Sequence, residues 1–192
     1  MVQDDFLGAI RSPARSDPEE RALLERIVHR DRPAFEALYR QYYRRLTRFL
    51  DRLIRQPDVI EEVLNDVMFA VWTRASTYNQ ESRVSTWIFA IAYRQALKRL
   101  RDQGAPFEEL PDQDDIPEER GGGPEALAMH RQSAERLLAA METLPVEQRT
   151  VVELTYFHGL AYPEIAKIMD CPNDTVKTRM FHARRKLRQM LE

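Results

Sequence analysis

The sequence predicts an all-α protein in which two small helical domains are joined by an acidic flexible linker. Three observations support this fold class. Apolar residues recur at three- and four-residue spacing along most of the 192 residues, which is typical of helices with one buried face. Neither half shows the sustained alternation of apolar and polar residues that indicates a half-buried strand. Residues 102–126 combine four prolines and four glycines with little apolar material, which favours an extended linker.

The first half is expected to form helices separated by short breaks. Residues 1–30 are an N-terminal extension, disordered at first and then helical over 18–30. In the first domain, 31–101, apolar residues from Phe35 to Leu53 line one side of a helix that Pro57 ends. A second helix covers 58–74 with Asp58 as its N-cap, and a polar loop, 75–83, leads to a third over 85–101.

The second domain, 127–192, is expected to contain a helix-turn-helix. A helix around 126–142 and another after Pro145 precede two short helices joined at residues 170–172. Ala166 is small enough for a close helix crossing, and Asp170 tolerates the left-handed backbone of a sharp turn. The β-branched Val176 is placed to pack the second helix on the first. A purely structural helical corner is the alternative.

The last helix has two different faces. Its apolar stripe consists of Val176, Met180, Ala183, Leu187 and Leu191. The opposite face carries cations around Thr178 and Phe181, which suits duplex DNA because cations neutralise phosphates while Thr and Phe contact base edges. A basic face that meets only solvent is the alternative. The predicted DNA contacts are Thr175, Lys177, Thr178, Arg179, Phe181, His182, Arg184 and Arg185.

The helix over 85–101 offers a second candidate surface. Trp87, Arg94, Lys98 and Arg101 lie on one stripe at helical spacing. An aromatic ring that stacks on exposed bases, followed by cations along the backbone, suits single-stranded or melting DNA. The alternative is that Trp87 belongs to the core and the cationic side chains extend past it into solvent.

Composition narrows the function classes. The net charge of −2 conceals +5 over 31–101, −8 over 102–126 and +2 over 127–192, so two basic bodies flank an acidic connector. The N-terminus does not resemble a signal peptide, and no apolar run reaches the roughly 18–20 residues of a membrane span, so membrane insertion is not expected. A single cysteine, Cys171, excludes an internal disulfide and fits a cytoplasmic location. No catalytic constellation, phosphate loop or metal-ligand set is evident, so no enzyme activity, metal or cofactor is expected.

Four segments carry a family resemblance: DRPAFEALYRQYYRRL, EEVLNDVMFAVW, STWIFAIAYRQALKRLR, and the run from Leu144 to Leu187. They resemble, in order and spacing, the two domains of a bacterial RNA polymerase sigma factor of the sigma-70 family. The compact build, without an intervening domain, is similar to the extracytoplasmic-function (ECF) group. The resemblance implies promoter-specific transcription initiation, with core RNA polymerase and promoter DNA as partners and an anti-sigma factor as an expected inhibitor.

The same resemblance implies site residues. The exposed face of the helix over 58–74 would dock on the polymerase through Glu61, Glu62, Asn65, Asp66 and Phe69. The loop with Tyr78 and Asn79, together with the Trp87 helix, would recognise and open the −10 element. The helix-turn-helix would read the −35 element, and the acidic linker would follow the RNA path of the polymerase.

Some positions depart from the family pattern, and other functions remain open. Arg94 and Lys98 replace an Asn and an Asp that are common in the −10-reading helix, and Asp174 places a carboxylate near DNA. These departures leave the sequence preference at both elements open. One alternative is a stand-alone helix-turn-helix regulator that binds duplex DNA without polymerase. Another is an adaptor whose acidic linker binds basic partners, although this leaves the stripe of Trp87 and its cations unexplained.

Overall fold

A computed structural model describes residues 17–104 and 131–191 of the chain, which form helices joined by short turns and loops. The first range contains α2 (Asp17–Val28), α3 (Arg32–Ile54), α4 (Pro57–Arg74), the 3-10 turn η1 (Ala75–Thr77) and α5 (Val84–Asp102). The second contains α6 (Arg131–Glu142), α7 (Val146–Val152), the π-helical η3 (Glu153–Phe157), α8 (Tyr162–Met169) and α9 (Asn173–Leu191). No strand occurs within these two ranges, so the predicted all-α class is confirmed. The disordered start and most of the linker predicted from the sequence lie outside the described residues.

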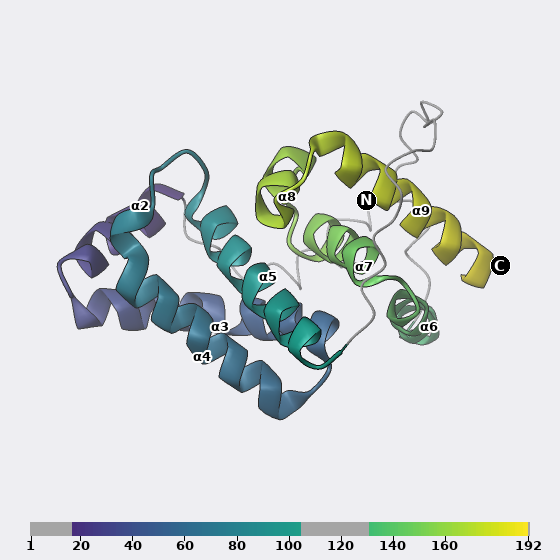
Figure 1. Cartoon of the computed structure of the whole chain (residues 1–192), viewed down its shortest axis with the longest axis horizontal. Coiled ribbons are helices and arrows are strands. Elements are labelled where there is room, and N and C mark those ends of the chain that lie inside the picture. Colours follow the sequence, from purple (N-terminus) through teal and green to yellow (C-terminus); the bar gives the residue numbers. More distant parts are fainter. Residues whose placement is uncertain (1–16, 105–130, 192) are drawn as a thin grey trace.

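Helices α2, α4 and α5 pack around the long helix α3. Asp31 caps α3, because its Oδ1 accepts a hydrogen bond from the Ala34 N–H at 3.2 Å. The inner side of α3 places Tyr42 and Phe49 in the core, where Phe49 meets Phe89 of α5 edge to face at 5.2 Å between ring centroids. Figure 1 shows α4 and α5 running alongside α3 in this domain.

The start of α4 corrects one detail of the sequence prediction. Asp58 is not the N-cap, because Pro57 already occupies the first helical position and Gln56 becomes the cap residue. Proline is favoured there since its missing N–H has no partner within a helix. Asp58 instead lies in the first turn, where its carboxylate interacts favourably with the helix dipole.

The helix-turn-helix predicted at the C-terminus is present. Helix α8 ends at Asp170, whose φ of 51° and ψ of 52° give the left-handed turn expected there. The buried side of α9 consists of Val176, Met180, Ala183 and Leu187. Leu191, predicted on the same stripe, is 43% exposed because it lies in the final turn, beyond the core that the other four residues share.

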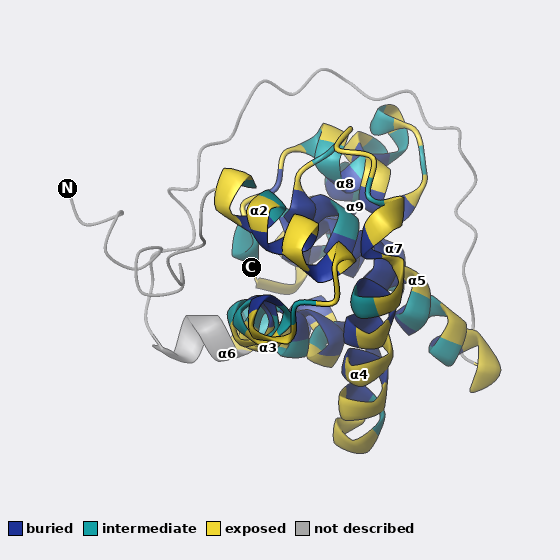
Figure 2. Cartoon of the chain, turned by 90° about the vertical axis from the view of Figure 1, so that its left-hand side faces the viewer, coloured by how far each residue is buried: buried dark blue, intermediate teal, exposed yellow. Residues whose placement is uncertain are grey.

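The two domains pack against each other in one continuous core (Figures 1 and 2). Helix α8 lies beside α5, and α7 lies beside α3. At the junction the His158 ring is 4.6 Å from that of Phe89 and 6.0 Å from that of Phe49. An ion pair of 2.9 Å joins Arg55 to Glu142 at its edge. The two domains are therefore in direct contact, an arrangement that we call closed.

Candidate nucleic-acid interface

The outer face of α9 is free of the core. Lys177, Arg184 and Arg185 are exposed, and the other predicted DNA contacts are half-buried: Thr175, Thr178, Arg179, Phe181 and His182. Phe181 lies off the buried stripe and packs against the neighbouring His182, with ring centroids 5.5 Å apart. The surface therefore presents an aromatic pair framed by cations, although the structure itself holds no DNA contact.

Several of these cations already have partners on the protein. Arg184 donates from Nε and Nη2 to the Tyr156 hydroxyl, at 3.1 and 2.8 Å. Arg179 Nη1 donates to Cys171 Sγ at 3.5 Å. Within the described residues no hydrogen bond or ion pair involves the Arg185 side chain, so among the predicted arginine contacts its guanidinium is the most available to a phosphate.

Asp174, the carboxylate at the head of this face, is paired with a cation. Its Oδ1 accepts from Lys177 Nζ at 2.8 Å, and this hydrogen bond, with the charge of Asp174, raises the pKa of the Lys177 ammonium. Thr178 Oγ1 donates to the Asp174 carbonyl at 3.0 Å. The pairing partly neutralises Asp174, which lowers the repulsion a DNA phosphate would meet there.

The loop before α5 and the first turn of α5 form a second surface. The Tyr78 and Trp87 ring centroids are 5.7 Å apart, and the Tyr78 hydroxyl donates to the Ser82 carbonyl at 2.5 Å. Burial raises the pKa of the Tyr78 phenol. Asn79 Oδ1 accepts from the Glu81 N–H at 3.2 Å and so stabilises the turn. Trp87 is half-buried against the core, which agrees in part with the core alternative, and its stacking on DNA bases stays a prediction.

The cations predicted to accompany Trp87 lie further along α5. Arg94, Lys98 and Arg101 are all exposed, and Ile88 and Ala92 on the other side are buried. The stripe is therefore a real surface feature. Its role in binding DNA stays a prediction.

A third surface lies on α4, whose outer side is exposed (Figure 2). The predicted docking residues Glu61, Glu62, Asn65, Asp66 and Phe69 are all exposed. Phe69 stands out among the large apolar residues of the described chain, with 67% of its surface open to solvent. Glu62 also pairs with Arg99 of α5. The α4 surface thus presents an exposed phenylalanine beside carboxylates, and its role in docking stays a prediction.

Sequence reasoning missed the contact between α8 and the second surface. Lys167 Nζ donates to the Glu81 carbonyl at 2.8 Å, and Thr86 Oγ1 donates to Glu164 Oε1 at 3.4 Å. Arg83 adds an ion pair to Glu164 at 3.6 Å. Thr86 is only 1% exposed as a result. These partners are about 80 residues apart in the chain, and no local pattern signals them.

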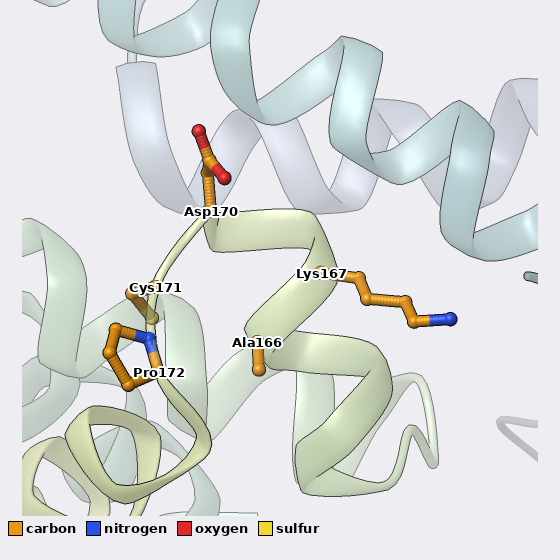
Figure 3. A pocket seen from close by; sticks show the side chains of 5 residues that line it. All are labelled: Ala166, Lys167, Asp170, Cys171 and Pro172. Atoms are coloured by element: carbon orange, nitrogen blue, oxygen red, sulfur yellow. The ribbon is translucent and has the colours of Figure 1, made fainter.

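A shallow hollow lies at the turn of the helix-turn-helix. It is lined by Ala166, Lys167, Asp170, Cys171 and Pro172. Figure 3 shows Lys167 extending away from the turn, while Cys171 and Pro172 lie together at its base. In the described part of the chain, no group of three His, Cys, Asp or Glu side chains could hold a metal ion. None of the described helices is long and apolar enough to cross a membrane.

Comparisons with known proteins agree with this geometry of an all-helical, two-domain protein that ends in a helix-turn-helix. The model of sigma-70 region 2 matches residues 38–105, and that of sigma-70 region 4 matches residues 134–187. The chain therefore belongs to the sigma-70 family, in its ECF group.

Relatives and solved structures extend over most of the chain. The ECF RNA polymerase sigma-E factor of Haemophilus influenzae is 28% identical over 181 residues, which cover 90% of this chain and 95% of the relative. The ECF RNA polymerase sigma-E factor of Escherichia coli K12 is 29% identical over 173 residues, which cover 86% of this chain and 90% of the relative. The structure of CnrH in complex with the cytosolic domain of CnrY is similar with a TM-score of 0.66 and 20% identity, covering 90% of this chain and 97% of that one. The structure of the sigma factor RpoE in complex with the anti-sigma factor NepR from Bartonella quintana is similar with a TM-score of 0.58 and 23% identity. The match covers 82% of this chain and 96% of that one.

Proposed function

We propose that this sigma factor uses its three surfaces for three separate tasks. The α4 surface docks on core RNA polymerase, the Tyr78–Trp87 surface recognises and opens the −10 element, and the outer face of α9 reads the −35 element. The observation that carries the proposal is the exposure of Phe69 on α4, at 67%; Trp87 and Phe181 are half-buried, on helices that also carry exposed cations. A phenylalanine exposed to that extent has no role in the core of the domain.

The chemistry of each surface fits its task. The aromatic pair of Tyr78 and Trp87 can stack on unpaired bases, and the cations along α5 can follow a single strand. The Arg185 guanidinium on α9 suits a phosphate, and Phe181 suits a base edge in the major groove. As an initiation factor the chain contributes binding surfaces, while the polymerase carries out the synthesis of RNA. It acts where the polymerase is, in the cytoplasm.

Simultaneous use of both DNA surfaces requires the closed arrangement to open. The two promoter elements lie about 25 base pairs apart, which is roughly 85 Å at about 3.4 Å per pair. A compact domain of about 100 residues has a radius of gyration of only ~13 Å, so two packed domains cannot reach both elements. Residues 105–130, between the described ranges, can span up to about 90 Å if fully extended. The chain is thus long enough for the domains to separate.

An anti-sigma protein is the proposed inhibitor. Both structural neighbours are described as complexes, one with the cytosolic domain of CnrY and the other with the anti-sigma factor NepR. The stand-alone regulator considered from the sequence is not favoured, because the relatives match both domains and not the helix-turn-helix alone.

Site-specific crosslinking tests the assignment of the surfaces. A photo-crosslinking amino acid replaces Phe181 in one variant, Tyr78 in a second and Leu191, on the opposite side of α9 from the DNA face, in a control. In complexes of core polymerase, sigma factor and promoter, the Phe181 position should crosslink near −35 and the Tyr78 position near −10. The control should crosslink at neither. A Phe181 crosslink near −10, or none to DNA, contradicts the assignment.

A further inference from the structure

Helix α2 lies outside both family-model matches, and the sequence suggested no role for it beyond leading into the first domain. In the structure its first turn reaches the start of α5. Asp17 Oδ1 accepts a hydrogen bond from the Val84 N–H at 2.9 Å. The cap residue of α5 itself, Arg83, makes no capping bond with its side chain within the described residues. Asp17 therefore satisfies an N–H at the start of a helix that begins 67 residues later.

The next turn of α2 reaches the middle of the loop. Arg21 Nε donates to Asp17 Oδ2 at 2.7 Å, and Arg21 Nη1 donates to Gln80 Oε1 at 3.4 Å. Gln80 has a φ of 61°, in the left-handed region that a residue other than glycine rarely adopts. The Arg21 contact helps hold the loop in this conformation.

These contacts from α2 lie next to the Tyr78–Trp87 surface, at Gln80 of the loop and Val84 of α5. Trp87 follows Val84 by three residues, so the direction of the first turn of α5 sets where its ring points. The Tyr78 ring packs against the Trp87 ring and, with Gln80 of the loop and Arg21 and Leu24 of α2, lines one hollow. Two side chains of α2 thus contact the loop and the start of α5, in addition to the contacts that α8 makes there.

We propose that Asp17 and Arg21 are positioning residues for recognition of the −10 element. They touch no base themselves, and they act by holding the Tyr78 and Trp87 rings in the orientation that bases meet. The inference rests on the proposed role of that surface. The two side chains are 24% and 34% exposed, so replacing them removes the contacts without opening the core. Glu20, between them in sequence, is buried against Tyr42 and has a structural role.

The test uses core polymerase with the full chain and a promoter library that has a fixed −35 region and random bases around −10. Transcripts are sequenced, and the enrichment of the best over the worst −10 sequences is measured. Asp17→Ala should flatten this preference by roughly fivefold to tenfold, as expected when a cap bond and base contacts are weakened. Preference in a matching −35 library should stay unchanged. Asp17→Asn keeps an oxygen for the Val84 N–H and should restore most of the −10 preference.

A matched control lies on the same helix. Arg26→Ala breaks an ion pair of similar length, 2.8 Å to Asp31, that does not reach the loop, and it should keep the wild-type profile. The inference is overturned if Asp17→Ala only lowers total transcription, or if Asn and Ala at position 17 behave alike. If Asp17→Ala does not fold, three variants provide the same test: Arg21→Ala, Gln80→Ala and the double variant. Unchanged −10 preference in all three overturns the inference. Absence of −10 preference in the wild type would instead contradict the proposed function.

Discussion

The ring of His158 from the C-terminal domain lies 4.6 Å from the ring of Phe89 in the first domain. The His158 side chain is only 5% exposed, and Glu153 beside it is 2% exposed in its side chain. Arg52 of α3 lies 3.9 Å from Glu153 Oε2. One buried cluster thus joins the two domains, and under the proposed function its strength should set how easily they separate on a promoter.

The first prediction concerns this cluster. His158→Ala removes a buried ring that packs against Phe49 and Phe89, and should lower the free energy of unfolding by about 2–4 kcal/mol through lost packing. The distance between fluorophores on the two domains should also increase. Urea denaturation and energy transfer measure the two effects. His182→Ala, on the half-buried outer face of α9, should change stability by less than about 0.5 kcal/mol. Equal effects of the two variants would contradict the packing described.

The second prediction concerns the docking surface. Phe69→Ala should weaken binding to core polymerase by roughly tenfold or more, as for an aromatic residue at the centre of an interface. Stability should hardly change, because Phe69 is mostly exposed. Leu191→Ala, which truncates another exposed apolar residue, is the control and should leave polymerase affinity intact. A fluorescence binding assay with labelled sigma factor measures the affinity, and wild-type affinity in Phe69→Ala would refute the docking assignment.

The third prediction separates two neighbouring cations on α9. Arg185→Ala should weaken use of all −35 sequences and reduce the slope of log affinity against log salt by about 1, as for a lost phosphate contact. Arg184→Ala should have a smaller effect, since Arg184 is already bonded to Tyr156. Binding of the polymerase complex to −35 DNA, titrated at several salt concentrations, gives both slopes. A larger slope change for Arg184→Ala would reverse the assignment.

The fourth prediction concerns pH. Burial raises the pKa of Glu20 above its ordinary value near 4.5, against the opposing effect of the hydrogen bond from Tyr42. The native state therefore binds this proton more tightly than the unfolded chain, and the contribution of Glu20 to stability is lost as pH rises through the raised pKa. Glu20→Gln removes the titration. The stability of wild type minus that of Glu20→Gln should increase in urea denaturation as the pH is lowered from neutral toward the ordinary value of 4.5. A difference that is constant with pH would show that the pKa of Glu20 is the same in both states.

Helical periodicity was sufficient to predict much of the fold. The buried side of α9 follows it from Val176 to Leu187, and the left-handed turn at Asp170 follows from the tolerance of that residue for such a backbone. Leu191 departs from the pattern because periodicity cannot show where the neighbouring helices end. Asp58 departs from it because two residues competed for the start of α4, and Pro57 took the first helical position.

The sequence predicts which residues are exposed on the candidate surfaces, but not the hydrogen bonds that join these surfaces to other helices. Exposure of Arg94, Lys98 and Phe69 follows from helix geometry alone. The bond from Asp17 to Val84 and that from Lys167 to the Glu81 carbonyl join residues 67 and 86 positions apart. Such pairs arise from tertiary packing, to which spacing along one helix gives no guide.

Run-off transcription with core polymerase tests the central claim most directly. Core enzyme is incubated with promoter fragments alone, with the wild-type chain, or with a variant that combines Glu62→Lys and Asp66→Lys. Transcripts with defined start points should appear only with the wild-type chain, because the charge reversals remove the docking surface while leaving both DNA surfaces intact. The same transcripts from core enzyme alone, or full activity of the charge-reversed variant, would contradict the account.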